Sequence, residues 1–563
     1  EGTVLLENDG ILPLKDTKNI NVFGWASVNP IYGGSGAGAL NDLYDRVTML
    51  EGLEDAGFKL NGELTDLYTN YGKERADYGS DWSLPEVPAE DYSDELIENA
   101  KEFSDTAIVT IARWGGEGSD LPTDMSSVSY TNNSDSYNDF EAGQHYLELS
   151  QTEKNMINLV CENFEHVILV YDGLSTFELG FVEDYPQIEG VLWCAGPGQT
   201  GFDSLGKIIS GEVNPSGKTS DTFLYDLTET PTWNNFGDFK YDNMEEFKID
   251  ESDPYVGGSV PTFVNYVEGI YVGYRFYETA AQEGFLDYDK VVKYPFGYGL
   301  SYTTFEYDNL QVKPDGATFT LRNTGKYDGA EIAQLYVGLP GAKVFRPVKE
   351  LKGFSKVFLK AGEEKTVTIK FDDKTFRYWN MKTNKWEVEG GVYSIMIGAS
   401  CADIRLQDSL AIIGTTEVMP YYTNRVSSYV EGKIQQVGNE EYETILGHSI
   451  PDGSWSGELG MNDALCQMYY AKSGIARFIC KKLGEKLKKS EAAGIPDLNT
   501  LFQYNMPFRA IAKMTGGMVS MEMVEGLLKV VNGHFSGLGK VISGFFRNQK
   551  LNKQYEKDLE EQK

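Results

Sequence analysis

The chain has 563 residues, which at roughly 150 residues per domain allows three to four domains. Hydrophobic residues make up 41% and charged residues 24% of the sequence, a composition that excludes a disordered, collagen-like or disulfide-stapled chain. The 85 acidic residues outnumber the 50 basic ones, and the resulting net charge of -35 argues against a nucleic-acid-binding protein, which needs a basic surface to contact phosphates.

The first 220 residues alternate between short apolar runs and helical stretches. Strands are predicted at residues 20–25, 106–112, 166–171 and 188–194, and helices at residues 45–56, 95–103 and 151–163. Ser150 and Glu153 have the spacing of a capping box at the start of the last helix. Near-continuous apolar strands alternating with helices predict an α/β sandwich with a mostly parallel sheet, whose ligands bind at the carboxyl ends of the strands.

A glycine-rich loop follows the first predicted strand. It contains Gly33, Gly34, Ser35 and Gly36 directly after Tyr32. Such a loop lets a ligand approach the backbone and offers N–H groups to it. The spacing matches neither a dinucleotide-binding fingerprint nor a P-loop, so a plain surface loop stays open as the alternative.

A second glycine-rich segment, Arg113-Trp114-Gly115-Gly116-Glu117-Gly118, follows the strand at residues 106–112. Glycines on both sides of Glu117 allow a sharp turn that presents a carboxyl group at the edge of the sheet. A carboxyl group beside an apolar wall has a raised pKa, which suits a general acid/base. A charged residue in an ordinary glycine-rich turn is the alternative interpretation.

Metal, disulfide and membrane chemistry find little support in the sequence. The four histidines are far apart and lack metal-ligand spacing, so no metal and no cofactor are expected. The five cysteines are too few for a disulfide framework, which favours a reducing compartment, the cytoplasm, with secretion as the alternative. No apolar run reaches the ~18 residues of a membrane span, and no signal peptide opens the chain.

The sequence pattern changes twice in the rest of the chain. Residues 228–287 are interpreted as an irregular connection, and residues 305–413 read as a β-sandwich of immunoglobulin or fibronectin type III kind, with strands at 317–321, 331–337, 356–359, 365–371 and 391–397. Residues 414–563 are predicted to be helical, with amphipathic helices at 462–489, 520–531 and 540–562. Residues 471–563 carry 16 Lys and Arg against 9 Asp and Glu. The basic helix at 472–489 is expected to dock on the acidic body rather than on a membrane, with another anionic surface or plain solvation as alternatives.

Several motifs resemble those of glycoside hydrolase family 3, the β-glucosidase family. They are the opening Gly-Thr-Val-Leu-Leu-Glu-Asn-Asp-Gly-Ile-Leu-Pro-Leu at residues 2–14, Asn-Pro-Ser-Gly-Lys at 214–218, Glu-Gly-Ile-Tyr-Val-Gly-Tyr-Arg-Phe-Tyr at 268–277, and Arg-Pro-Val-Lys-Glu-Leu-Lys-Gly-Phe at 346–354. The resemblance covers roughly residues 1–410. It implies a family 3 α/β sandwich with its connector at residues 1–300, a fibronectin type III-like domain at 301–415, and a helical, basic extension at 416–563.

The resemblance also implies roles for individual residues. By this likeness Glu117 is the acid/base, and Gly33, Gly34, Ser35, Gly36, Arg113 and Trp114 bind the substrate, a β-linked oligosaccharide or glycoside. Where family members often carry an arginine after the acid/base turn, this sequence has Leu121, and Arg113 is expected to take over that polar role.

A retaining glycosidase needs two carboxyl groups about 5 Å apart, and only one is found. In the family the second is an aspartate of a (β/α)8 barrel, and no barrel is expected in these 563 residues, whose first residue is Glu rather than Met. We therefore expect a carboxyl-terminal portion of a β-glucosidase-like enzyme that is inactive without its barrel. Alternatives are a non-catalytic carbohydrate-binding or regulatory module, or a structural scaffold. For the tail, a homodimer contact and packing against the barrel both stay open.

Overall fold

The computed structural model describes residues 1–34, 38–41, 43–75, 81–116, 121–233, 239–252, 257–258, 260, 262–450, 454–492 and 497–561. Contacts divide the chain into two compact units. The first consists of Glu1–Asn234 with Tyr266–Ile445, and the second of Asn235–Asn265 with Leu446–Lys563.

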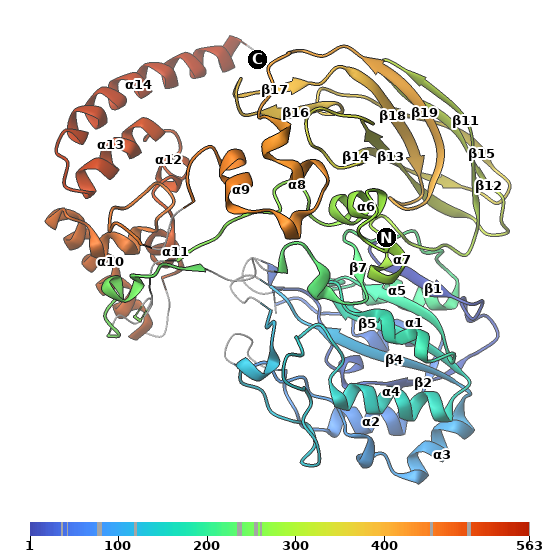
Figure 1. Ribbon diagram of the computed structural model, residues 1–563. Coiled ribbons are helices and arrows are strands. Elements are labelled where there is room, and N and C mark those ends of the chain that lie inside the picture. The colour runs from blue at the N-terminus through green and yellow to red at the C-terminus, as the bar shows by residue number, and fades with distance from the viewer. Residues whose placement is uncertain are drawn as a thin grey trace. The chain divides into compact units, whose positions relative to one another are not determined.

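The first unit begins with a six-stranded sheet in the order β1-β6-β5-β4-β2-β3 (Figure 1). Its strands are β1 (Val4–Asn8), β2 (Asn19–Phe23), β3 (Lys59–Leu60), β4 (Thr106–Arg113), β5 (His166–Gly173) and β6 (Ile188–Cys194). All neighbours are parallel except β1, which pairs antiparallel with β6. The predicted mostly parallel sheet is confirmed, and the antiparallel edge strand β1 is an addition that the sequence analysis did not foresee.

Helices cover both faces of this sheet. They are α1 (Met49–Asp55), α2 (Gly62–Asn70), α3 (Asp94–Phe103), α4 (Gln151–Asn163) and α5 (Phe202–Ser210). One core joins α2, α3 and α4 to strand residues such as Val109 and Leu169, and the other joins α1 and α5 to their neighbours Ile108 and Ile168. Successive strand residues point to opposite faces, so the near-continuous apolar runs fill both cores.

Local signals explain where these helices begin. Ser150 and Glu153 form the predicted capping box at the start of α4, and Thr48 with Glu51 forms another at α1. Helices α1 and α5 then pack with almost no side chain between them, since an ideal Cβ on Gly206 would lie 1.9 Å from the carbonyl oxygen of Gly52. Glycine is required at this crossing because any side chain there would push the two helices apart.

A connector leads to a β-sandwich in the same unit. The connector contains β7 (Phe223–Leu224), α6 (Tyr274–Gln282), α7 (Tyr288–Val291) and β10 (Val292–Tyr294). The interpretation of residues 228–287 as irregular is wrong at α6, whose residues Phe276, Tyr277 and Ala280 are buried. Its aromatic composition hid the helical spacing of these buried positions.

The sandwich has two antiparallel sheets, β11-β12-β15 and β14-β13-β18-β19, around one apolar core. Their bounds are β11 (Phe305–Lys313), β12 (Gly316–Asn323), β13 (Gly329–Gly338), β14 (Glu350–Leu359), β15 (Glu364–Lys370), β18 (Gly391–Gly398) and β19 (Ile404–Ile412), and a separate hairpin joins β16 (Arg377–Asn380) to β17 (Lys385–Val388). The fibronectin-type prediction is confirmed. All five predicted strands are present, while β11 and β19 alternate too weakly to be recognised.

The second unit is mainly helical, as predicted for residues 416–563. It begins only at Leu446, however, and also includes residues 235–265. It contains β8 (Phe239–Lys240), β9 (Thr262–Phe263), α10 (Gly474–Ala492), α11 (Leu498–Asn505), α12 (Ala510–Met514), α13 (Met521–Val531) and α14 (Gly537–Glu561). The segment 235–265 joins this unit through Asn243, which exchanges two hydrogen bonds with the backbone of Trp455. The helix predicted at 462–489 is instead a 3-10 turn, Leu465–Tyr470, followed by α10.

Residues 416–445 belong to the first unit. They include α8 (Ser427–Val430) and most of α9 (Asn439–Leu446). Tyr421 and Tyr429 each stack on Phe345 of the β-sandwich domain, and Tyr271 of the connector donates a hydrogen bond to the carbonyl of Tyr429. The compact units and the expected domain limits thus divide the chain at different places.

Two chemical expectations can be compared with the described residues. All five cysteines are buried free thiols, so none takes part in a disulfide. Among the helices that the structure describes, none combines the length and apolar character needed to cross a membrane.

Candidate functional site

The candidate site lies at the carboxyl edge of the parallel sheet, where the loops after β2, β4, β5 and β6 meet. The loop after β2 contacts the loop after β6, because the amide of Gly198 donates a 2.8 Å hydrogen bond to the carbonyl of Tyr32. Leu174, after β5, lies beside Gly34, Gly115 and Gly196, which come from the other three loops. The edge predicted to hold the ligand site is therefore a place where four loops pack together.

The two glycine-rich segments identified in the sequence lie against each other. An ideal Cβ on Gly34 would lie 3.2 Å from the carbonyl oxygen of Gly115 and 3.6 Å from the Cα of Gly116. Gly33 packs within its own loop, since an ideal Cβ there would lie 3.0 Å from the carbonyl oxygen of Gly38 and 3.5 Å from the Leu40 side chain. Glycine at position 34 allows this backbone approach, which brings the loop after β2 to the two residues that precede Glu117 in the chain.

Three of the predicted site residues lie outside the described residues. They are Glu117, Ser35 and Gly36. Their roles as acid/base and substrate-binding residues stay predictions.

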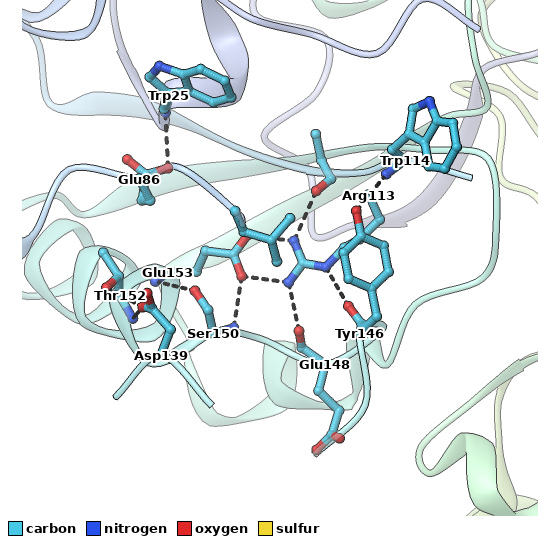
Figure 2. A network of polar contacts seen from close by, with 12 residues as sticks. Trp25, Glu86, Arg113, Trp114, Asp139, Tyr146, Glu148, Ser150, Thr152 and Glu153 are labelled. Atoms are coloured by element: carbon cyan, nitrogen blue, oxygen red, sulfur yellow. Dashed lines mark hydrogen bonds and ion pairs between the residues drawn. The ribbon is translucent and has the colours of Figure 1, made fainter. Parts of the chain in front are cut away.

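Arg113 has a different role from the substrate contact expected of it. Its side chain is fully buried, and its guanidinium forms a two-pronged ion pair with Glu153, both N···O distances being 2.6 Å (Figure 2). The other three N–H groups donate to the carbonyls of Ala112, Tyr146 and Glu148. Since a guanidinium has five N–H donors and all five are used, none remains for a sugar hydroxyl.

The Arg113–Glu153 pair ties together three elements of the sandwich. Arg113 ends β4, Glu153 lies in the first turn of α4, and Tyr146 and Glu148 belong to the segment between them. Burial by itself lowers the pKa of Arg113 because it disfavours the charged guanidinium. The charge and hydrogen bonds of the Glu153 carboxylate have a larger effect, so the pKa is raised overall. The prediction that Arg113 binds substrate is therefore corrected to a structural role.

The candidate Trp114 and a second tryptophan near this edge, Trp193, differ in exposure. Trp114 is half-buried, its amide donates to the hydroxyl of Tyr146, and its ring meets the ring of Trp82 edge to face. Trp193 is buried, and its indole N–H donates to the carbonyl of Gly173. Trp114 is thus partly exposed beside the site, whereas Trp193 is part of the core.

Two buried carboxylates that sequence reasoning missed border the same loops. Glu86 accepts hydrogen bonds from the amides of Trp25 and Val87, at 2.9 and 2.8 Å (Figure 2). Asp172, near the end of β5, accepts a 2.6 Å hydrogen bond from the amide of Ile31. Burial raises the pKa of Glu86 to about 8 and that of Asp172 to about 7. Asp172 was detectable as a carboxylate at the end of an apolar strand, but the predicted strand stopped at Tyr171.

The buried Glu86 makes a prediction about stability and pH. A carboxyl whose pKa is raised in the folded state favours folding at low pH, and that contribution is lost as pH rises from its unfolded pKa to about 8. Glu86→Gln mimics the protonated form and does not titrate. We expect the variant to gain about 4 kcal/mol relative to the parent protein between pH 4 and pH 9, at 1.36 kcal/mol per pKa unit. Urea unfolding at several pH values measures this difference, and parallel curves for the two proteins would contradict it.

Grouped metal ligands are absent from the part of the chain that the structure describes. No three His, Cys, Asp or Glu side chains there are placed so that they could hold a metal ion. The described edge presents backbone amides and carbonyls, a partly exposed tryptophan and buried carboxylates.

Comparisons with known proteins agree with this architecture. The family model for the glycosyl hydrolase family 3 C-terminal domain matches residues 3–274, and that for the fibronectin type III-like domain matches residues 331–401. Thermostable β-glucosidase B of Acetivibrio thermocellus is 29% identical over 546 residues, covering 94% of this chain and 58% of the relative. An exo-α-(1→6)-L-arabinopyranosidase of Bifidobacterium breve is 31% identical, over 75% of this chain and 48% of the relative.

The solved structures give the same result. β-Glucosidase 3B of Thermotoga neapolitana, in complex with α-D-glucose, superposes with a TM-score of 0.57 at 29% identity, over 73% of this chain and 52% of that chain. The chain spans about half the length of the curated relatives it matches. The protein carries the C-terminal domain of glycosyl hydrolase family 3, followed by a fibronectin type III-like domain.

Proposed function

We propose that the protein is a retaining β-glycosidase of the β-glucosidase type, in which this chain supplies the general acid/base Glu117. The nucleophilic carboxylate comes from a (β/α)8 barrel domain that these 563 residues do not supply. The substrate is a terminal β-glycosidic bond of an oligosaccharide or glycoside. By itself the chain folds but does not turn over glycosides.

The observation that carries this proposal is the meeting of Gly34 with Gly115 and Gly116. It brings a glycine-rich loop to the turn that precedes Glu117, at the edge of the sheet where α/β proteins bind ligands. Family 3 membership supports the class of reaction, and named relatives include β-glucosidases as well as arabinopyranosidases. Because the relatives act on different sugars, we assign the sugar specificity to residues of the barrel domain.

The chemistry requires the second domain. In a retaining glycosidase one carboxylate attacks the anomeric carbon while a carboxylic acid about 5 Å away protonates the departing oxygen. The same residue then acts as a base, taking a proton from the water that hydrolyses the glycosyl-enzyme. Glu117 performs both proton transfers in this scheme, and without the nucleophile neither bond-making step takes place.

A complementation experiment tests the division of roles. The chain, a family 3 barrel domain from the same full-length protein, and their mixture are each assayed with an aryl β-glucoside, and the anomer formed first is followed by NMR. We expect activity only in the mixture or the full-length protein, and the β-anomer as first product. Activity of the chain alone would contradict the assignment of the nucleophile to the barrel.

The same samples decide the alternative of a non-catalytic module. Under that alternative the full-length protein binds a β-linked oligosaccharide in calorimetry but releases no sugar. Sugar release that depends on both parts excludes it. An α-anomer as the first product would contradict the retaining mechanism.

A further inference from the structure

The segment that leads into the glycine-rich loop is held at two points by buried carboxylates. After β2 the chain passes through the 3-10 turn Trp25–Ser27 and reaches the loop at Ile31. The amide of Trp25 donates to Glu86, and the amide of Ile31 donates to Asp172. Both carboxylates are buried. Each bond holds one backbone amide at a buried acceptor, so the loop begins from a fixed position.

The loop held in this way is packed on two sides. On one side Gly34 lies against Gly115 and Gly116, and on the other Tyr32 accepts the hydrogen bond from Gly198. Asp172 lies between these contacts in the sheet, since it pairs in register with Ala112 of β4 and Cys194 of β6. The acceptor of the Ile31 amide therefore lies on the strand between β4 and β6, whose following loops both contact the loop after β2.

The position of Asp172 is unfavourable for a carboxylate, because the side chain is removed from water. Its second oxygen, Oδ1, is buried and has no hydrogen-bond partner among the described residues. The charged and titratable groups that face it are Arg75, whose charge lowers its pKa, and Cys194, Tyr32 and Tyr171, whose pKa values its charge raises. A neutral side chain at this position would be less costly to bury, and carboxylates kept under such conditions are concentrated at functional sites.

We propose that Asp172 is a positioning residue of the glycosidase site. Its carboxylate holds Ile31 and so places the loop 31–34 against Gly115 and Gly116, the two residues that precede the acid/base Glu117 in the chain. The inference rests on the proposed function of Glu117. It assigns Asp172 no contact with the substrate, because its side chain is fully buried.

Two variants separate the charge from the hydrogen bond. In the full-length protein, Asp172→Asn keeps an acceptor for the Ile31 amide but removes the charge, and Asp172→Ala removes both. We expect Asp172→Ala to lower kcat for an aryl β-glucoside by about 10²-fold, the effect of a displacement near 1 Å. Asp172→Asn should lose less activity, and its pH–rate profile should lack the change near pH 7 caused by Asp172. KM should change little in both.

If Asp172 is kept for function, replacing it with asparagine should raise the stability of the protein while lowering its activity. At pH 8 the parent protein buries an ionised carboxylate, so Asp172→Asn is expected to unfold at a higher temperature while being less active. Glu331→Gln is the matched control, because Glu331 is also a buried carboxylate with a raised pKa but lies in the β-sandwich domain. We expect it to leave kcat unchanged. Unaltered kcat in both Asp172 variants would overturn the positioning role.

A readout independent of activity separates this inference from the proposed function. Hydrogen exchange of the peptide containing residues 25–34 should be faster in Asp172→Ala than in the parent protein and unaffected in Glu331→Gln. If the full-length parent protein hydrolyses no glycoside, the proposed function fails, while faster exchange still shows that Asp172 holds the loop. Unchanged exchange in Asp172→Ala overturns the inference whatever the activity.

Discussion

Replacing Glu117 with alanine in the full-length protein is expected to lower hydrolysis of a β-glucoside by about 10²–10⁴-fold, the contribution typical of a positioned general acid/base. The loss arises because the departing sugar oxygen no longer receives a proton and the attacking water no longer loses one. Steady-state kinetics with cellobiose, whose leaving group needs protonation, measures the effect. Glu98→Ala, which changes an exposed carboxylate on α3, is the matched control and should be as active as the parent protein.

Chemical rescue distinguishes this role from misfolding. An azide anion attacks the glycosyl-enzyme without needing a base, so azide should accelerate turnover of an activated aryl β-glucoside by Glu117→Ala and yield the β-glycosyl azide. Neither the parent protein nor Glu98→Ala should form this product. A Glu117→Ala variant with unaltered kcat would refute the acid/base assignment.

Replacing Arg113 with alanine is expected to destabilise the α/β sandwich by about 3–5 kcal/mol, because it leaves the Glu153 carboxylate buried without its counter-charge. The carbonyls of Tyr146 and Glu148 lose their donor in the same step. For a domain of this size the loss corresponds to a lowering of Tm by roughly 6–20 °C. Differential scanning calorimetry of the full chain measures the shift of the transition that belongs to the sandwich.

Two further variants show whether the pair itself is responsible. Arg113→Lys retains the charge but offers a single ammonium in place of a planar fork, so it should recover only part of the stability. Lys101→Ala breaks the exposed Lys101–Glu98 pair on α3 and should change stability by less than about 1 kcal/mol. If Arg113→Ala unfolds at the same temperature as Lys101→Ala, the Arg113–Glu153 pair does not stabilise the sandwich.

The regular part of the fold was predictable from local patterns. The strands β4, β5 and β6 are apolar runs bounded by polar turns, and α4 begins at a capping box. Each of these elements can therefore be recognised from a few neighbouring residues. Helix α6 and strand β1 were missed for different reasons. The aromatic side chains of α6 obscure its period, and the three consecutive apolar residues of β1 show no alternation that would mark a strand.

The site was predictable in part. The carboxyl edge of the sheet and the two glycine-rich segments followed from strand order and composition, and Gly34 does lie against Gly115. The role predicted for Arg113 was wrong because the sequence does not show whether an arginine near a candidate acid/base points toward the substrate or into the core. Its partner Glu153 is 40 residues away, and only the packing of α4 on β4 brings them together.

The sequence by itself determined the strands β4, β5 and β6 with helix α4, the fibronectin-like character of residues 305–413 and the edge of the sheet at which the site is expected, since these depend on neighbouring residues. The tertiary structure decided which polar groups are buried and what they hold. Asp172 and Ile31 are 141 residues apart, so neither the hydrogen bond between them nor the raised pKa of Asp172 can be read from local sequence. Both arise because folding removes the carboxylate from water and places an amide from a distant loop beside it.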